Sequence, residues 1–177
     1  MASLDPRLTG SLAGDEAHYP ETFAVAASSD GYALTFGLEP HLEPSTRSGR
    51  RFAKVGEGAT IVNVQIVHGE ETVIAVSEKR RALLCAVSEV SYLAGPGKGV
   101  LLVKLADDDR LLAMKTAKDD KDTLTVKTSM GGEQRINTAR FEKTTRGGKG
   151  REVVSRGTLT EVILEPPPAP PPFEEQR

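Results

Sequence analysis

Residues 146–150 read Arg-Gly-Gly-Lys-Gly, and two related stretches precede them, Gly-Pro-Gly-Lys-Gly at 95–99 and Arg-Ser-Gly-Arg-Arg at 47–51. We call these three stretches the corners. Each combines glycine, which permits sharp changes of chain direction, with at least one cation. They recur at an interval of about 50 residues, and such self-similarity at a fixed period is typical of repeat architectures.

Outward from the corners, three segments share one order of elements: 23–71, 72–122 and 123–162. Each segment has an opening strand, a turn, a second strand, a loop, its corner and a further strand. The turns are 29–31, 78–80 and 130–132, and the second strands are 32–36, 81–86 and 134–137. This period and strand count match a propeller blade. The sequence therefore predicts an all-β, propeller-like domain of about three four-stranded blades over residues 21–163, and leaves open whether the blades close, form an open arc or pair with another copy.

The strand assignment depends on short runs rich in β-branched residues between turn formers. These runs are 23–26, 32–36, 60–67, 72–76 and 100–104. Asp30-Gly31 between two of them predicts a hairpin. No window sustains an apolar stripe of helical period, so the sequence predicts only single helical turns, near 88–93 or 137–141.

Both ends differ from this pattern. Residues 1–20 mix glycine, proline and acids and are predicted to be a flexible leader or linker. The tail, 164–177, holds six of the 11 prolines, a composition that favours polyproline II, either as a solvated tail or as a ligand for a proline-binding module.

The longest apolar run, 82–87, is far shorter than the roughly 20 residues that cross a bilayer, and the N-terminus lacks a secretory signal. We therefore expect a cytoplasmic protein without a membrane partner. The single cysteine, Cys85, lies in this run and is predicted to be a small buried hydrophobe.

The net charge of −2 hides a strong asymmetry along the chain. Residues 1–46 carry −6 and residues 164–177 carry −2, whereas residues 47–163, with 21 cations against 15 acids, carry +6. The total argues against a polyanionic partner, but the repeat region alone is compatible with one.

The Gly-Lys pairs of the corners do not form a P-loop. That motif needs a glycine five positions before its second glycine and a serine or threonine after the lysine. Tyr92 and Gly99 stand at those positions around Lys98, and Lys143 and Gly150 around Lys149. Glycine-rich turns can instead bring backbone N–H groups to the phosphates of a nucleic acid, or they can serve only to turn the chain. Three corners at corresponding positions, each with a cation, favour a charged track along one rim.

A metal or catalytic site is not predicted. His18, His41 and His68 are scattered, and no cysteine joins them. The acidic runs 107–109 and 119–120 lack the glycine and distal glutamate of a calcium loop and are expected to be solvated turns. No cofactor is predicted.

Residues 141–150, Phe-Glu-Lys-Thr-Thr-Arg-Gly-Gly-Lys-Gly, resemble the glutamine-arginine-arginine-glycine-glycine-lysine-glycine box in the C-terminal DNA-wrapping domain of bacterial gyrase A subunits. The repeats, with a Gly-Tyr-Ala-Leu strand at 31–34 and their basic corners, resemble blades of that domain and of its relative in the topoisomerase IV A subunit. The resemblance covers about residues 21–163. It implies a β-pinwheel, a disc whose blades exchange strands and whose basic rim bends duplex DNA.

The resemblance also implies a role and a set of residues. The domain would bind duplex DNA largely without sequence preference and present a segment to the catalytic core and ATPase subunit of an ATP-dependent type IIA topoisomerase, in the cytoplasm at the nucleoid. The box-like corner implies Arg146, Gly147, Gly148, Lys149 and Gly150, and the other corners imply Lys98, Arg50 and Arg51. Flanking candidates, chosen from charge, are Arg47, Lys79, Arg80, Arg81, Arg135, Arg140, Lys143 and Arg151.

The chain departs from the family pattern. Thr144 and Thr145 replace the box glutamine and first arginine, the box lies in the last repeat, and there are three repeats instead of five or six. These differences favour a shortened topoisomerase IV-like domain over gyrase-type supercoiling. The winged-helix region that carries the DNA-cleaving tyrosine has no counterpart here, so the chain is not expected to be an enzyme by itself. A propeller-type protein-interaction scaffold whose corners are structural is the alternative.

Overall fold

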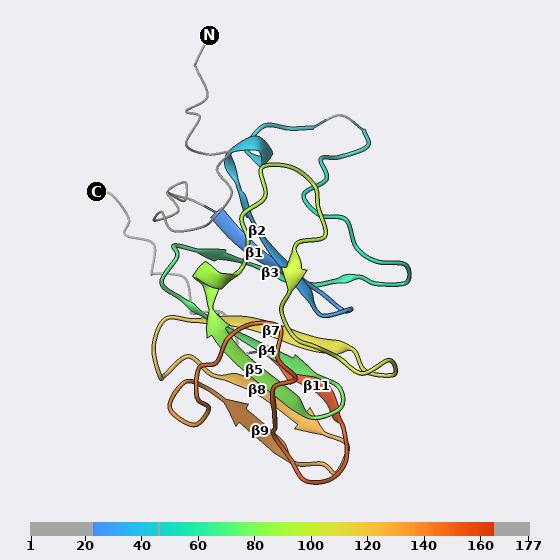
Figure 1. Cartoon of the computed structure of the whole chain (residues 1–177), viewed down its shortest axis with the longest axis vertical. Coiled ribbons are helices and arrows are strands. Elements are labelled where there is room, and N and C mark those ends of the chain that lie inside the picture. The colour runs from blue at the N-terminus through green and yellow to red at the C-terminus, as the bar shows by residue number, and fades with distance from the viewer. Residues whose placement is uncertain (1–22, 46, 165–177) are drawn as a thin grey trace, which may run out of the picture.

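Three antiparallel sheets succeed one another along the long axis of the molecule (Figure 1). The computed structural model describes residues 23–45 and 47–164. The predicted leader, and all of the predicted tail except its first residue, lie outside the described residues. The all-β, β-pinwheel-like prediction is confirmed for the part described, in which the only helices are two 3-10 turns, Glu39–His41 and Val87–Glu89.

Each of the first two sheets takes one strand from the next repeat. The first sheet has the order β3-β1-β2-β6 and the second has the order β10-β5-β4-β7. The first consists of β1 (Phe23–Ser28), β2 (Tyr32–Gly37), β3 (Ile61–Val67) and β6 (Val100–Leu101). The second consists of β4 (Thr72–Ser77), β5 (Arg81–Ala86), β7 (Leu111–Ala117) and β10 (Arg151–Glu152). Since β6 and β10 come directly after the second and third corners, the corners are the points where the chain crosses to the preceding sheet.

The third sheet has the order β11-β8-β9. Its strands are β8 (Leu124–Thr128), β9 (Glu133–Ile136) and β11 (Leu159–Ile163). Three strands, and not the predicted four, make up this sheet within the described residues. The reason is that the fourth strand of each sheet comes from the following repeat, and no repeat follows the third among these residues.

Apolar side chains fill the spaces between the sheets. Phe23, Val73 and Leu102 belong to the cluster between the first and second sheets, and Ile74, Val126 and Leu159 to the cluster between the second and third. All six residues of β1 and all six of β4 are buried, because both faces of these strands are covered. This explains why 72–76 reads as a continuous apolar run and not as an alternating strand.

The hairpins of the three sheets are held by corresponding hydrogen bonds. Ser29 N–H donates to Thr60 O at 2.8 Å, Glu78 N–H to Arg110 O at 2.9 Å, and Ser129 N–H to Thr158 O at 2.9 Å. The predicted Asp30-Gly31 hairpin is confirmed, with Gly31 at a φ of 85°. Arg80 occupies the same hairpin position in the second sheet at a φ of 71°, the one non-glycine residue of the described chain with a positive φ.

Some local predictions are wrong. The predicted strand 100–104 is only two residues long, because the chain leaves the sheet edge to bury Leu102 and Val103 in the core. The predicted single turn at 137–141, in contrast, is present, because the N–H groups of Arg140 and Phe141 both donate to Asn137 O. Asp109, expected in a solvated turn, is buried, and its carboxylate accepts hydrogen bonds from the N–H groups of Lys79 and Arg110.

Glu71 stabilises the turn between the first two repeats and provides a test of stability against pH. Its side chain is 3% exposed, and its carboxylate accepts hydrogen bonds from the N–H groups of His68 and Gly69 at 3.0 Å. Burial raises the pKa of Glu71, but these hydrogen bonds outweigh burial and lower the pKa below the ordinary value of 4.5.

We expect Glu71→Gln to lower the free energy of unfolding at pH 7 by about 1–2 kcal/mol, because buried N–H groups lose a charged acceptor. A lowered folded-state pKa gives stability that is full above the unfolded value of 4.5 and is lost as the pH falls through the folded value. Urea unfolding of both proteins from pH 7 to pH 3 should therefore show their stabilities converging in acid. The exposed neighbour Glu70 supplies the control, since Glu70→Gln should leave the pH profile unchanged. A constant difference between Glu71→Gln and wild type across the range would contradict this account.

Candidate nucleic-acid interface

The three corners lie in one row. Lys54 N–H, just after the first corner, donates to Gly97 O in the second at 2.8 Å, and Lys104 N–H, just after the second, donates to Gly148 O in the third at 2.8 Å. The segment that follows each of the first two corners thus contacts the next corner through an equivalent backbone hydrogen bond. We call this row, residues 47–51, 95–99 and 146–150, the corner track. It carries six cations and no acid.

Glycines of the track have a demonstrable structural role. Gly99 and Gly150 have φ values of 81° and 70°, and both lie against the second strand of the preceding sheet. A Cβ added to Gly150 would stand 2.5 Å from Ala82 O. The N–H group of Gly147 donates to Leu102 O at 2.7 Å, so it is already used within the protein. These three glycines therefore turn the chain and seat it on the neighbouring sheet.

Backbone N–H groups remain at the tips of the corners. Within the described residues, no hydrogen bond is made by the N–H groups of Lys98 and Gly99, or by those of Gly148, Lys149 and Gly150. Successive N–H groups in a turn form a concave site for an anion, and phosphate oxygens suit such a site. The tips thus have the donors that phosphate contact requires.

Several predicted cations are held by acidic or carbonyl oxygens. Lys98 Nζ lies 3.2 Å from an Asp30 carboxylate oxygen and 3.9 Å from the centre of the Tyr32 ring. Burial raises the pKa of Asp30. Hydrogen bonds from Ser28 and Lys98, together with the charge of Lys98, outweigh burial, so the pKa lies below its ordinary value. Arg146 donates from its side chain to Leu101 O at 3.3 Å and from its backbone to Glu89 at 3.1 Å. These contacts hold Lys98 and Arg146 close to the places where the strand after each corner docks on the preceding sheet.

The hairpin cations of the second sheet have partners too. Lys79 forms an ion pair with Asp108, and Arg81 donates to Gly150 O at 3.3 Å. Arg80 donates to Ser155 O at 2.7 Å and lies 3.8 Å from Glu152. Its left-handed backbone costs about 1–2 kcal/mol in a residue other than glycine, and glycine stands at this position in the other two hairpins. A side chain kept at that cost is a candidate for a functional role.

Other predicted cations are exposed, and their side chains form no hydrogen bond or ion pair with another described residue. They are Arg47, Arg50, Arg51, Arg135, Arg140, Lys143, Lys149 and Arg151. The first three and Lys149 belong to the corner track. Arg135 is on β9, and Arg140 and Lys143 are on the loop that leads into the third corner. The structure thus brings the track residues together and leaves Arg135 on an outer strand.

Lys104 was missed by the sequence reasoning. Its exposed side chain lines a hollow of about 500 Å³ together with Lys79, Arg80, Arg81 and Lys149. Asp108, Asp109 and Glu152 line the same hollow, so five cations face three acids. The signal that could have identified Lys104 is its position five residues after the corner glycine Gly99, as Lys54 is five residues after Gly49.

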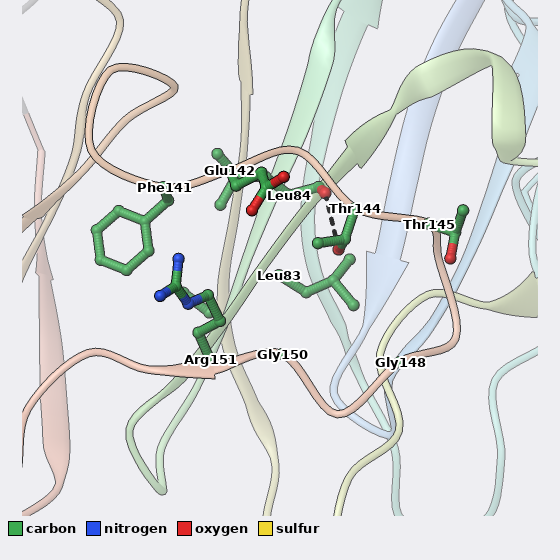
Figure 2. A pocket seen from close by; sticks show the side chains of 10 residues that line it. Leu83, Leu84, Phe141, Glu142, Thr144, Thr145, Gly148, Gly150 and Arg151 are labelled. Atoms are coloured by element: carbon green, nitrogen blue, oxygen red, sulfur yellow. Dashed lines mark hydrogen bonds between the residues drawn. The ribbon is translucent and has the colours of Figure 1, made fainter.

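The box-like segment 141–150 packs across β5, as Figure 2 shows. Thr144, which stands where the related box has glutamine, donates its backbone N–H to Leu84 O at 2.7 Å and its hydroxyl to the same oxygen at 3.3 Å. Beneath this segment lies a hollow of about 230 Å³, lined by Leu83, Phe141 and Arg151 among others. The segment is therefore a strap over the second sheet whose tip carries Lys149.

Features of other site classes can be placed as well. Within the described residues, no three His, Cys, Asp or Glu side chains could jointly hold a metal ion, and no helix is long and apolar enough to cross a membrane. Cys85 is buried as predicted, and burial, with a smaller effect of the Glu89 charge, raises its pKa to about 12. Its thiol is therefore unreactive at neutral pH.

Sheets that each borrow a strand from the next repeat, arranged along a row of glycine-rich corners, define a β-pinwheel fold. Solved structures share it. The C-terminal domain of DNA topoisomerase IV matches with a TM-score of 0.73 and 18% identity over 83% of this chain and 47% of that one. The DNA gyrase A C-terminal domain matches with a TM-score of 0.66 and 19% identity over 82% and 50%. The E. coli ParC C-terminal domain matches with a TM-score of 0.60 and 17% identity over 80% and 61%.

The chain spans about half the length of the first two of these domains. No protein-family model matches it, and no curated protein matches it. At 17–19% identity, these likenesses establish the fold.

Proposed function

We propose that this chain is a DNA-binding and DNA-bending domain of a type IIA topoisomerase A subunit. It would present a duplex segment to a separate strand-passage core and its ATPase subunit, in the cytoplasm at the nucleoid. The observation that carries the proposal is the corner track, in which six cations, of which Lys98 pairs with Asp30, lie along one row of corners. The sequence resemblance and the shared fold agree with it. No catalytic step is assigned to this chain.

Binding would consist of phosphate contacts without base readout. Lysine and arginine side chains neutralise phosphates, and backbone N–H groups at the corner tips complete the contacts. The track follows successive sheets, so a duplex that contacts all three corners would have to follow the same path. The resemblance to the DNA-wrapping domains adds that the duplex would be bent along this path.

Salt dependence tests this mode of binding. About six phosphate contacts give a slope near −5 in a plot of log K against log salt concentration. Fluorescence anisotropy with a labelled linear duplex, measured between 50 and 200 mM salt, should show this slope, and duplexes of unrelated sequence should bind alike. Affinity that hardly changes with salt would refute phosphate-dominated binding.

Bending has its own test. Relaxed circular DNA, nicked and religated with the purified chain present, should acquire a linking-number change whose sign reports the handedness of the path. The chain is then removed and the topoisomers are separated on a gel. A topoisomer distribution identical to that without protein would contradict bending by the track, even if binding occurs.

A protein-interaction scaffold is the second candidate. The contacts of Lys98 with Asp30 and of Arg146 with Leu101 O favour it, because they show that some corner cations stabilise the joints. On this account, the loss of exposed track cations would leave function intact. The charge-removal experiment that opens the Discussion separates the two candidates.

A further inference from the structure

The two completed joints between sheets have the same construction. At the first, Gly99 lies against Ala33 O, so closely that a Cβ would overlap this oxygen, and Leu102 N–H donates to Gly31 O at 2.9 Å. At the second, Gly150 lies against Ala82 O, and Val153 N–H donates to Arg80 O at 2.8 Å. Each joint therefore has two halves. The donor half is a left-handed corner glycine and the strand that follows it, and the acceptor half is the unpaired edge of a second strand together with its hairpin.

The first corner supplies the donor half of such a joint, but this half is unused. Gly49 has the same left-handed backbone, with a φ of 71°, yet no described atom lies within 4 Å of the position of its Cβ. The residues after it belong to no sheet, and within the described residues Phe52 N–H makes no hydrogen bond. The backbone is thus shaped for a close approach that the described residues do not make.

The third sheet supplies the acceptor half. Its second strand, β9, is an edge, whereas β2 and β5 are each covered by a strand from the next repeat. Gly131 O corresponds to Gly31 O and Arg80 O in the other hairpins, and it accepts no hydrogen bond within the described residues. Unpaired strand edges of this kind are templates for another chain.

Register and charge show that the two halves fit. In the completed joints, Ala33 pairs with Val100 and Ala82 pairs with Arg151. The same register, applied to the unused halves, places Arg50 opposite Glu133. Opposite charges directly across an antiparallel pair are favourable, and both side chains are exposed in the single chain.

We propose that residues 49–53 of one copy add to β9 of a second copy as the fourth strand of its third sheet. Gly49 would lie against Glu133 O, Phe52 N–H would donate to Gly131 O, and Arg50 would pair with Glu133. Two joints of this type, one in each direction, close a pair with two-fold symmetry. The pair holds six sheets and has about the length of one matched solved domain, since this chain spans 47–50% of the first two.

Association without DNA is the first test, so its outcome is independent of the proposed function. Analytical ultracentrifugation over a range up to millimolar concentration should show the 18.9 kDa chain passing into a species of twice that mass. A single 18.9 kDa species throughout would overturn the proposal.

Glycine variants separate the joint from general backbone effects. Gly49→Ala should weaken association at least about ten-fold, since its Cβ would overlap the carbonyl of Glu133. Gly58→Ala is the matched control, because Gly58 has a φ of 68° and, like Gly49, no described atom near its Cβ position. Equal effects of the two substitutions would count against the proposed joint.

Cross-linking tests the register directly. An Arg50→Cys chain mixed with a Glu133→Cys chain should form a disulfide-linked pair on mild oxidation, because directly opposed residues of an antiparallel pair are close enough for a disulfide. Cys85 is buried and does not interfere. Lys127→Cys, on β8, replaces Glu133→Cys as the control and should not cross-link. Failure of the first mixture, or equal yield from both, would overturn the register.

Discussion

Replacing Arg47, Lys104 and Lys149 together by alanine is expected to weaken binding to linear duplex DNA by about 10²–10³-fold at 0.1 M salt. Each phosphate contact contributes about 0.9 to the slope of log K against log salt, so three lost contacts remove about 2.7 log units at that concentration. The slope itself should fall by about 3. Anisotropy titrations of both proteins at several salt concentrations provide both quantities.

This triple variant isolates phosphate contact from folding. The three side chains are exposed and form no hydrogen bond or ion pair with another described residue, so their loss should not disturb a joint. Lys98 and Arg146 would be poorer targets, because their contacts with Asp30 and Leu101 O stabilise the protein. Thermal unfolding of the variant should match that of wild type within about 0.5 kcal/mol, as is usual for surface substitutions.

Three exposed lysines outside the corner track offer a control with the same change of net charge. Lys118 and Lys121 lie in the turn after β7, and Lys127 is an exposed residue of β8 in the third sheet, where it forms an ion pair with Glu161. The triple alanine variant of these lysines should weaken binding far less than the track variant. Equal losses would show that only net charge matters, and no loss in either would favour the scaffold.

The repeat pattern predicted the fold because it reflects local chemistry. Alternating turn formers and β-branched runs indicate hairpins within one repeat, and Asp30-Gly31 correctly predicts the first of them. The corners were found because glycine is needed where the chain bends sharply onto another strand, as Gly99 and Gly150 do. Burial of Cys85 followed from the apolar run around it.

Contacts between repeats could not be read from the residues alone. The pairing of Lys98 with Asp30 depends on how one repeat seats on the next. The hydrogen bonds that Asp109 accepts lie within one repeat, but that from Lys79 joins a hairpin to a loop 30 residues further along the chain. The prediction of four strands in the third sheet was wrong for the same reason. The fourth strand of a sheet comes from the following repeat, and this exchange cannot be seen within a single repeat. The DNA-contacting role of all 16 candidate residues stays a prediction, and the charge-removal experiment tests it for Arg47 and Lys149.

Gly99→Ala is expected to lower the free energy of unfolding by about 3–4 kcal/mol, the largest stability effect that we predict for a single methyl group in this chain. The left-handed backbone, with a φ of 81°, costs about 1–2 kcal/mol once a Cβ is present. Overpacking costs typically 1–3 kcal/mol more, because this Cβ overlaps the backbone oxygen of Ala33, which cannot move aside as a flexible side chain would.

The control for this substitution is Gly58→Ala, whose φ of 68° carries a similar backbone strain in open space. It should cost about 1–2 kcal/mol, so the difference between the two variants in chemical denaturation measures the close approach alone. Gly150→Ala, with its Cβ 2.5 Å from Ala82 O, should resemble Gly99→Ala. If all three variants lost the same stability, backbone strain would account for the corner glycines, and the joints would not depend on close contact between corner and strand. A larger loss for the two joint glycines would instead show that the absence of a side chain at these corners is what allows one repeat to complete the sheet of another.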